Sequence, residues 1–263
     1  MISRVVAITG ASAGIGRATA LRLARDGASV AISARRISQL NEVAAEITAA
    51  GGHALPLVAD VTSEEDMEML VRSSIERFGR LDVMICNAGF GVAGSIDEIT
   101  PDQMRKLVDV NYMGTYHAAR AALPVFRRQG RGHLIMISSI VGKRGVPYMG
   151  AYAATKFAQV GLAECLRSEF VGSDIHVSVV YPVSTDTEFF DVMSHETGSS
   201  VRRSAGPVQS AEQVANAIAR AIKHPVPEVY PHTLSRGLAW LNTLAPGFCD
   251  RVVRKYGRKP SNA

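Results

Sequence analysis

Short apolar runs rich in β-branched residues alternate along the chain with longer stretches in which apolar residues recur at helical spacing. The runs are almost continuously apolar, which is typical of strands that are covered on both faces. They predict strands at residues 4–8, 29–34, 54–59, 81–86, 133–138, 175–181 and, with the weakest pattern, 228–230. Because strands and helices alternate, we expect an α/β fold with a parallel, doubly wound sheet of about seven strands and helices on both faces.

Three helix starts carry capping signals. Thr100 and Ser210 are each followed three residues later by a glutamine, which predicts capping boxes. Ser63 precedes three acidic residues, which the helix dipole favours in a first turn. No linker or change of composition separates these elements, so we expect residues 1–263 to form a single domain.

Two segments do not follow the alternation. Residues 186–208 are rich in glycine, serine and proline and predict a long loop with at most one helical turn. Loops of this length are usually functional or disordered, and we expect this one to be a substrate loop. Residues 232–263 predict a C-terminal helical extension, in which leucines recur at helical spacing before Pro246. Packing over the protein's own pocket or core is the favoured interpretation, ahead of an oligomer contact and, last, attachment to a membrane surface.

The composition is that of an ordinary globular protein, with 47% hydrophobic and 20% charged residues. No apolar run approaches the roughly 18 residues of a transmembrane helix, and the N-terminal run is too short for a signal peptide. Three dispersed cysteines indicate a reducing compartment. We therefore expect a cytoplasmic protein, and since the histidines lack metal-ligand spacing, we predict no metal site.

The formal net charge of +5 could indicate nucleic acid, a membrane or an anionic ligand as partner. The one dense basic group lies at the C-terminus and consists of Arg251, Arg254, Lys255, Arg258 and Lys259. A solvated basic tail is the favoured interpretation of this group. No nucleic-acid partner is expected.

A glycine-rich turn follows the first predicted strand and leads into the first predicted helix. Gly10, Gly14 and Gly16 would let the backbone turn sharply and approach a diphosphate closely. The N–H groups at the start of the helix would then face the negative charge. The turn predicts a dinucleotide-binding site.

The end of the second predicted strand indicates which dinucleotide binds. An acidic residue there would bind the adenosine ribose hydroxyls of NAD, whereas arginine would meet the 2′-phosphate of NADP. The chain has Arg35 and Arg36 and no acid at this point. Two solvated loop arginines are the alternative, but the missing carboxylate favours NADP(H).

Tyr152 and Lys156 form a candidate catalytic pair. Residues four apart share one face of a helix, so the lysine ammonium can approach the phenol and favour its ionised form. The spacing alone is a weak signal. Ser139 strengthens it, because this hydroxyl follows a predicted strand at the sheet edge where α/β proteins place ligands.

These features together resemble the short-chain dehydrogenase/reductase family, over roughly residues 4–231. The motifs that carry the resemblance are, in order, Thr9-Gly10-x-x-x-Gly14-Ile15-Gly16, Asn87-Ala88-Gly89, Asn111, Ser139 and Tyr152-x-x-x-Lys156. The resemblance implies a Rossmann-type fold, one dinucleotide-binding and catalytic domain, and hydride transfer between a nicotinamide and a carbonyl or secondary alcohol. It also implies a homodimer or homotetramer.

The resemblance assigns roles to four residues. Tyr152 would be the general acid/base, and Lys156 would lower its pKa and bind the nicotinamide ribose. Ser139 would orient the substrate oxygen. Asn111 would help to hold a water molecule in a proton relay with Lys156.

The resemblance also implies a set of cofactor contacts, with Asp60 at the adenine and Thr187 at the carboxamide. The expected cofactor-binding residues are Gly10, Ser12, Ala13, Gly14, Ile15, Gly16, Arg35, Arg36, Asp60, Val61, Asn87, Ala88, Gly89, Tyr152, Lys156, Pro182, Thr185 and Thr187. The chain departs from the family pattern twice, with Cys86 in place of an asparagine and Val183 in place of a glycine. We expect Cys86 to alter strand packing and Val183 to place bulk near the nicotinamide.

The residues expected to face the substrate are mainly apolar. They are Ser139, Val141, Tyr148, Tyr152, Val183 and Phe189, with Ile140, Val146, Met149, Phe190 and Met193 as further candidates. We therefore expect a small hydrophobic ketone or secondary alcohol as substrate. Two alternatives are a non-catalytic protein that senses NADP(H) on the same fold and an NAD-dependent alcohol dehydrogenase.

Overall fold

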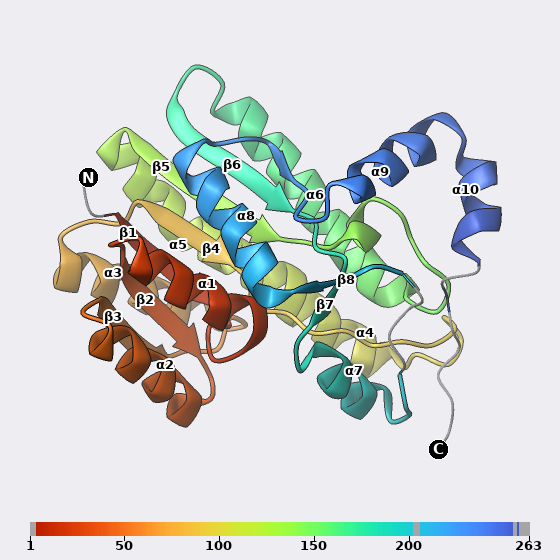
Figure 1. Cartoon of the computed structure of the whole chain (residues 1–263), viewed down its shortest axis with the longest axis horizontal. Coiled ribbons are helices and arrows are strands. Elements are labelled where there is room, and N and C mark those ends of the chain that lie inside the picture. Colours follow the sequence, from red (N-terminus) through yellow and green to blue (C-terminus); the bar gives the residue numbers. More distant parts are fainter. Residues whose placement is uncertain (1–3, 202–205, 255–256, 258–263) are drawn as a thin grey trace.

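A parallel sheet forms the centre of the molecule (Figure 1). The computed structural model describes residues 4–201, 206–254 and 257, and within these ranges seven strands form the sheet in the order β3-β2-β1-β4-β5-β6-β9. Their bounds are Val5–Thr9 for β1, Ser29–Ala34 for β2, His53–Val58 for β3, Val83–Cys86 for β4, Arg131–Ile137 for β5, Asp174–Val180 for β6 and Glu228–Val229 for β9. All neighbouring strands pair in parallel. The predicted Rossmann-type sheet is confirmed, and each predicted strand is present.

The strand order reverses at β1. The chain runs from β1 through β2 to β3 on one side and then returns to β4 on the other side of β1. The connections after β1 and β4 therefore leave the sheet in opposite directions, and a crevice opens at the carboxyl ends of these two strands. This is where the predicted ligand-binding residues lie.

Helices cover both faces of the sheet, and the core is divided between the two faces. The helices α1 (Gly14–Arg25), α2 (Ile37–Ala49) and α8 (Ala211–Lys223) pack on one face, and α3 (Glu64–Phe78), α5 (Gly114–Gln129) and α6 (Gly150–Glu169) on the other. Successive residues of β1 alternate between the faces, with Val6 and Ile8 on the first and Val5 and Ala7 on the second. Because both faces of β1 are covered, Val5 to Ile8 are all apolar and buried, as the sequence pattern predicted.

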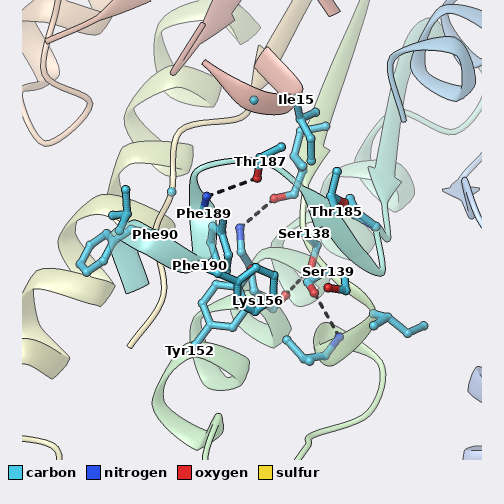
Figure 2. A pocket seen from close by; sticks show the side chains of 18 of the residues that line it. Ile15, Phe90, Ser138, Ser139, Tyr152, Lys156, Thr185, Thr187, Phe189 and Phe190 are labelled. Atoms are coloured by element: carbon cyan, nitrogen blue, oxygen red, sulfur yellow. Dashed lines mark hydrogen bonds between the residues drawn. The ribbon is translucent and has the colours of Figure 1, made fainter. Parts of the chain in front are cut away.

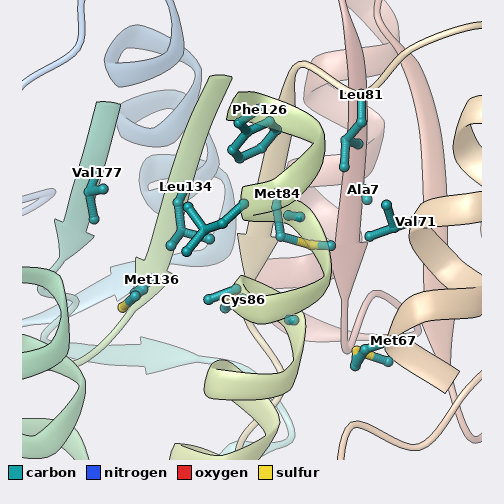
Figure 3. Close-up of a cluster of buried hydrophobic side chains, with 14 of the residues drawn as sticks. Ala7, Met67, Val71, Leu81, Met84, Cys86, Phe126, Leu134, Met136 and Val177 are labelled. Atoms are coloured by element: carbon teal, nitrogen blue, oxygen red, sulfur yellow. The ribbon is translucent and has the colours of Figure 1, made fainter. Parts of the chain in front are cut away.

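The second face carries the larger aromatic and sulfur-containing side chains (Figure 3). Phe126 of α5 lies against the start of β5, where a Cβ on Gly132 would come within 2.1 Å of its ring. Cys86 lies in this cluster, and its thiol donates to the Thr115 carbonyl at 3.9 Å. Burial raises the Cys86 pKa to about 12. Cys86 thus contributes to packing between β4 and α5.

The predicted helix starts are present. Ser63 caps α3 by accepting a hydrogen bond from the Asp66 N–H, and Thr100 and Ser210 form full capping boxes at α4 (Pro101–Leu107) and α8. A π-helical turn, η1 (Val108–Met113), joins α4 to α5. A short 3₁₀ turn, η2 (Ile140–Gly142), follows β5.

The predicted substrate loop is more ordered than its composition indicated. It contains β7 (Ser184–Asp186), which pairs with β8 (Val208–Ser210), and a nine-residue helix, α7 (Phe189–Thr197). The prediction of at most one helical turn was therefore wrong. The helix is stabilised by long-range contacts with α4, in which Gln103 Nε2 donates to the Glu196 carbonyl at 2.8 Å and Lys106 pairs with Glu196 at 2.6 Å.

The C-terminal extension forms two helices, α9 (Leu234–Leu244) and α10 (Pro246–Val253), at the edge of the molecule (Figure 1). Of the predicted basic tail, Lys255, Arg258 and Lys259 lie outside the described residues. Among the helices of the described chain, none is both long and apolar enough to cross a membrane.

A buried histidine connects two strands of the sheet. The His133 Nε2 of β5 donates to Ser178 Oγ at 2.8 Å, since Ser178 donates its own proton to the Val226 carbonyl at 2.5 Å. His133 Nδ1 has no hydrogen-bond partner among the described residues. Burial lowers the His133 pKa to about 3, with smaller contributions from His176 and Arg4.

This histidine makes the fold acid-sensitive. The unfolded histidine titrates near 6.5 and the folded one near 3, so the unfolded chain binds the extra proton between these values. As the pH falls through this range, His133 should lower the free energy of unfolding by roughly 1.4 kcal/mol per pH unit. Urea unfolding at neutral and mildly acidic pH should show a smaller loss in His133→Leu than in the wild type. Equal losses would contradict the prediction.

Candidate active site

A cavity of about 710 Å³ lies along the carboxyl edge of the sheet. The glycine turn and the paired arginines line one end of it. Ser139, Tyr152, Lys156 and the C-terminal extension line the other. Figure 2 shows Ser139, Tyr152 and Lys156 gathered in this cavity near Phe189 and Phe190. The cavity thus connects the two groups of residues that the sequence singled out separately.

The turn between β1 and α1 has the geometry of a phosphate cradle. Gly10 and Gly14 adopt φ angles of +65° and +54°, and a Cβ on Gly16 would lie 2.3 Å from the Gly10 carbonyl oxygen. Gly16 does not line the cavity but permits this close packing beneath it. Ala13, the N-cap of α1, makes no side-chain capping bond, and the first turn contains no acidic residue. The helix N-terminus is therefore suited to a diphosphate.

Asn87 stabilises this turn from the neighbouring strand. Its Nδ2 donates to the carbonyls of Thr9 and Gly10 at 2.9 and 3.0 Å. The backbone N–H groups of Asn87 and Ala88 donate to Thr9 Oγ1 at 3.0 and 3.1 Å. Asn87 lines the cavity as expected, but its side-chain amide is used within the protein. Gly89 also lines the cavity, and a Cβ there would come within 3.0 Å of Asn111 Oδ1.

The arginines lie at the mouth of the glycine end. Arg35 and Arg36 are exposed and line the cavity. Arg36 donates to Ser12 Oγ at 3.1 Å and forms an ion pair with Glu188, which precedes α7. This corner therefore combines two guanidinium groups and a hydroxyl, all suited to a phosphate, with one carboxylate that already binds Arg36.

The predicted adenine residues lie beside this corner. Asp60 lines the cavity, and its Oδ1 accepts hydrogen bonds from the Thr62 N–H and hydroxyl at 2.9 and 2.8 Å. Val61 also lines the cavity and packs against Gly114, where a Cβ would lie 2.6 Å from Val61 Cγ2. The loop after β3 is thus fixed against the start of α5.

Ser139 and Tyr152 meet at the other end. Ser139 lies two residues after the end of β5 and is the N-cap of η2. Its Oγ accepts a hydrogen bond from the Val141 N–H at 3.3 Å. Tyr152, on the first turn of α6, is buried beside the Phe189 ring, with 5.6 Å between ring centroids. Burial raises the Tyr152 pKa above its usual value, and a hydrogen bond with Ser139 opposes that increase. The protein alone therefore keeps Tyr152 protonated.

Lys156 lies one turn further along α6 and is buried. Its Nζ donates to the Ile137 carbonyl at 2.8 Å and to Gln159 Oε1 at 3.3 Å, and lies 5.7 Å from the centre of the Tyr152 ring. Burial lowers the Lys156 pKa to about 7. That Lys156 lowers the Tyr152 pKa stays a prediction; in the structure a hydrogen bond with Ser139 opposes the increase that burial causes.

Gln159 is a site residue that the sequence analysis missed. It is fully buried, and its Nε2 donates to the Asn111 carbonyl at 2.8 Å and to Thr115 Oγ1 at 2.7 Å. With both amide protons used, its Oε1 must face Lys156. The Gln159 amide thus directly connects Asn111 to Lys156. The water molecule that the resemblance implies in this relay stays a prediction. The sequence feature that could have identified Gln159 is its position three residues after Lys156, where a polar residue lies on the buried side of the same helix.

Asn111 lies in the π-helical turn η1 and does not line the cavity. Its Nδ2 donates to the Phe90 carbonyl at 2.9 Å and to Thr155 Oγ1 at 3.1 Å, and its Oδ1 accepts from the Phe90 N–H at 3.0 Å. Its side chain therefore fixes the loop after β4 to α6, and its carbonyl is the group directed to Gln159.

The segment after β6 closes the cavity. Thr187 packs over Gly14, where a Cβ would lie 3.2 Å from Thr187 Cγ2. Thr185 Oγ1 donates to the Val183 carbonyl at 2.9 Å and accepts from Gln209 Nε2 at 3.1 Å. Pro182, Val183, Thr185 and Thr187 all line the cavity. Val183, which stands where the family has glycine, therefore does place bulk in it.

Most of the predicted substrate residues line the cavity, but Tyr148 and Met193 do not. Tyr148 adopts a φ of +64°, and its carbonyl accepts a hydrogen bond from the Gly94 N–H at 2.8 Å, so the predicted helix begins only at Gly150. Met193 is fully buried against Gly91. Backbone conformation and helix orientation thus direct these two side chains away from the cavity. The residues that line the cavity as predicted are Ser139, Ile140, Val141, Val146, Met149, Tyr152, Val183, Phe189 and Phe190.

Comparison with known proteins agrees with this arrangement. The short chain dehydrogenase family model matches residues 4–198. An uncharacterized oxidoreductase of Listeria monocytogenes is 35% identical over 229 residues, which cover 85% of this chain and 92% of the relative.

Two solved structures of similar fold contain nicotinamide cofactors. An alcohol dehydrogenase of Thermococcus sibiricus, complexed with 5-hydroxy-NADP, is 30% identical, with a TM-score of 0.77 over 87% of this chain and 95% of the other. A 3-ketoacyl-(acyl-carrier-protein) reductase of Brucella melitensis, complexed with NADH, is 27% identical, with a TM-score of 0.77 over 87% of this chain and 97% of the other. Because the family match covers most of the chain and includes both ends of the cavity, this protein belongs to the short-chain dehydrogenase family of oxidoreductases.

Proposed function

We propose that this protein transfers a hydride between NADP(H) and the carbonyl or secondary alcohol of a small hydrophobic molecule. The observation that supports this most directly is the single cavity, in which Ser139 and Tyr152 lie at one end and the glycine turn at the other. The bound nicotinamide would supply the hydride in reduction and accept it in oxidation. The residues of the chain would position the substrate oxygen and exchange its proton.

Tyr152 is the proposed proton donor for reduction. Burial raises its pKa, so the hydroxyl carries its proton at neutral pH. Ser139 has one hydroxyl proton, which it would donate to the substrate oxygen in place of Tyr152 as negative charge develops there. In oxidation the same two groups would act in reverse, with Tyr152 accepting the proton.

Lys156 would exchange protons with the site during this transfer, and Gln159 would hold the Lys156 side chain in position. The lowered Lys156 pKa, about 7, leaves the group able to gain or lose a proton near neutral pH. Gln159 Oε1 accepts from Lys156 Nζ, and this hydrogen bond stabilises the ammonium form. We therefore assign Gln159 as a positioning residue that acts through Lys156.

NADP(H) is the proposed cofactor because the adenosine end of the cavity is cationic. Arg35, Arg36 and Ser12 offer donors to a 2′-phosphate, and no acidic residue of β2 is present to bind ribose hydroxyls. The Glu188 carboxylate competes with a 2′-phosphate for the Arg36 guanidinium, because it forms an ion pair with Arg36. A 2′-phosphate would have to replace that carboxylate.

A hydrophobic substrate is proposed because apolar side chains dominate the other end of the cavity. They are Val141, Val146, Met149, Val183, Phe189, Phe190, Leu234, Leu238, Val252 and Val253.

We further propose that a single domain carries both cofactor binding and catalysis, and that the protein is a cytoplasmic homodimer or homotetramer. The partly exposed aromatic side chains of Tyr116 on α5 and Phe157 on α6 support such an assembly.

Substitution of Tyr152 by phenylalanine tests the mechanism. Loss of the proton donor should lower kcat roughly 100-fold or more, because the ring keeps its packing and only the hydroxyl is removed. NADPH oxidation with a panel of hydrophobic ketones measures turnover, and NADPH fluorescence measures cofactor binding, which should be retained. Unchanged turnover in Tyr152→Phe would refute the assignment. A wild-type protein that binds NADPH without any turnover would instead support the cofactor-sensing alternative.

Two substitutions at the cavity mouth test the cofactor preference in opposite directions. Arg36→Ala should weaken NADPH binding by about tenfold or more and NADH binding little, because only NADPH carries the 2′-phosphate. Glu188→Gln should strengthen NADPH binding, because it releases the Arg36 guanidinium. Fluorescence titrations of both cofactors give the dissociation constants. If Arg35→Ala and Arg36→Ala weaken both cofactors equally, the NAD-dependent alternative is favoured.

Gln159→Met tests the positioning role. The variant keeps the side-chain volume but removes the acceptor for the Lys156 ammonium, so the Lys156 pKa should fall further. The alkaline limb of the kcat–pH profile should then move to lower pH, and kcat near neutral pH should fall about tenfold. KM for the ketone should change little. A reduced kcat with an unshifted pH profile would indicate only a packing defect.

A further inference from the structure

The charge of the chain is concentrated at one end. Residues 234–263 contain six of the 29 Lys and Arg residues and one of the 24 Asp and Glu residues, which gives a formal net charge of +5. Residues 1–233 contain 23 of each and have a net charge of zero. The entire net charge of the protein therefore belongs to the C-terminal extension. The basic residues of the extension that the structure describes are Arg236, Arg251 and Arg254, and all three are exposed.

The outer face of α9 is apolar. Trp240 and Leu244 lie one turn apart with 62% and 80% of their surfaces exposed, and Leu241 lies beside them. Phe248 of α10 is 52% exposed. This group, which we call the α9 face, reverses the usual arrangement in which a surface helix turns its apolar side inward.

Polar contacts on the inner side fix this orientation. Arg144, in the loop after η2, donates to Asn242 Oδ1 of α9 at 2.9 Å and forms an ion pair with Asp250 of α10. Asn242 Nδ2 donates to the Lys143 carbonyl at 3.2 Å. The side that carries Leu238 lines the cavity. The extension therefore covers the substrate end of the cavity with one side and exposes the α9 face with the other.

We infer that the α9 face binds the surface of an anionic phospholipid bilayer. A tryptophan and exposed leucines flanked by arginines are typical of helices that lie in the membrane interface. The exposed Arg236, Arg251 and Arg254 match the negative potential of such a surface. A second copy of the chain is the poorer partner, because a symmetric contact would bring the exposed Arg236, Arg251 and Arg254 of both copies together.

Membrane binding would also explain where the hydrophobic substrate comes from, namely the lipid bilayer. This second step rests on the proposed function. Leu234 and Leu238 line the cavity from α9, and Val252 and Val253 line it from α10. The substrate end therefore lies directly beneath the surface that would contact lipid. A lipid-dissolved ketone or alcohol would reach the cavity without crossing water.

The chain contains a single tryptophan, Trp240, so its own fluorescence reports the contact. Vesicles rich in phosphatidylserine should shift the Trp240 emission to shorter wavelength and carry the protein upward in a flotation gradient. Phosphatidylcholine vesicles or high salt should give much weaker binding. The Arg251→Glu and Leu244→Glu variants should each bind more than about tenfold less tightly. These two side chains do not line the cavity.

Matched variants away from the extension serve as controls. Arg128→Glu changes an exposed arginine of α5, and Val171→Glu changes a valine that is 84% exposed. Both should bind vesicles as the wild type does. Equal vesicle binding by all variants, or none by the wild type, would overturn the inference. So would sedimentation data showing that Leu244→Glu separates a dimer into monomers. Turnover of a water-soluble ketone without vesicles tests the proposed function separately.

Discussion

The burial of the Lys156 ammonium group is the constraint on which the catalytic end of this protein depends. An amine removed from water must find hydrogen-bond acceptors, and the fold supplies them from two directions, the Ile137 carbonyl of β5 and the Gln159 amide of α6. Gln159 is itself oriented by Asn111 and Thr115. The π-helical turn that presents the Asn111 carbonyl therefore helps, through Gln159, to supply a hydrogen-bond acceptor for the buried Lys156.

The same network connects elements that are distant in the chain. Ser138 Oγ donates to the Lys156 carbonyl at 3.0 Å, which fixes the end of β5 to α6. The Asn111 side chain bonds the loop after β4 to the same helix. Since Ser139 and Tyr152 extend from the end of β5 and from α6, these hydrogen bonds help to determine their relative position.

The sequence alone predicted the features that depend on local chemistry. The seven strands, the capping boxes at Thr100 and Ser210 and the glycine turn follow from periodicity, side-chain capping and positive φ angles, which are visible in short windows of sequence. Three other features required the assembled fold. Helix α7 is stabilised by α4, the Tyr148 side chain is redirected by a positive φ, and Gln159 acquires its role from Asn111, which lies 48 positions earlier in the chain.

The position of Cys86 in the core has a consequence for the covalent reactivity of the protein. Only a thiolate attacks electrophiles and oxidants readily, and burial that raises the Cys86 pKa to about 12 leaves almost none at neutral pH. Cys249 is also buried, whereas Cys165 on α6 is exposed. Alkylation or a fluorescent maleimide should therefore mark the folded protein at Cys165 alone. This gives the native chain one defined attachment point, on the far side of α6 from the buried Tyr152 and Lys156.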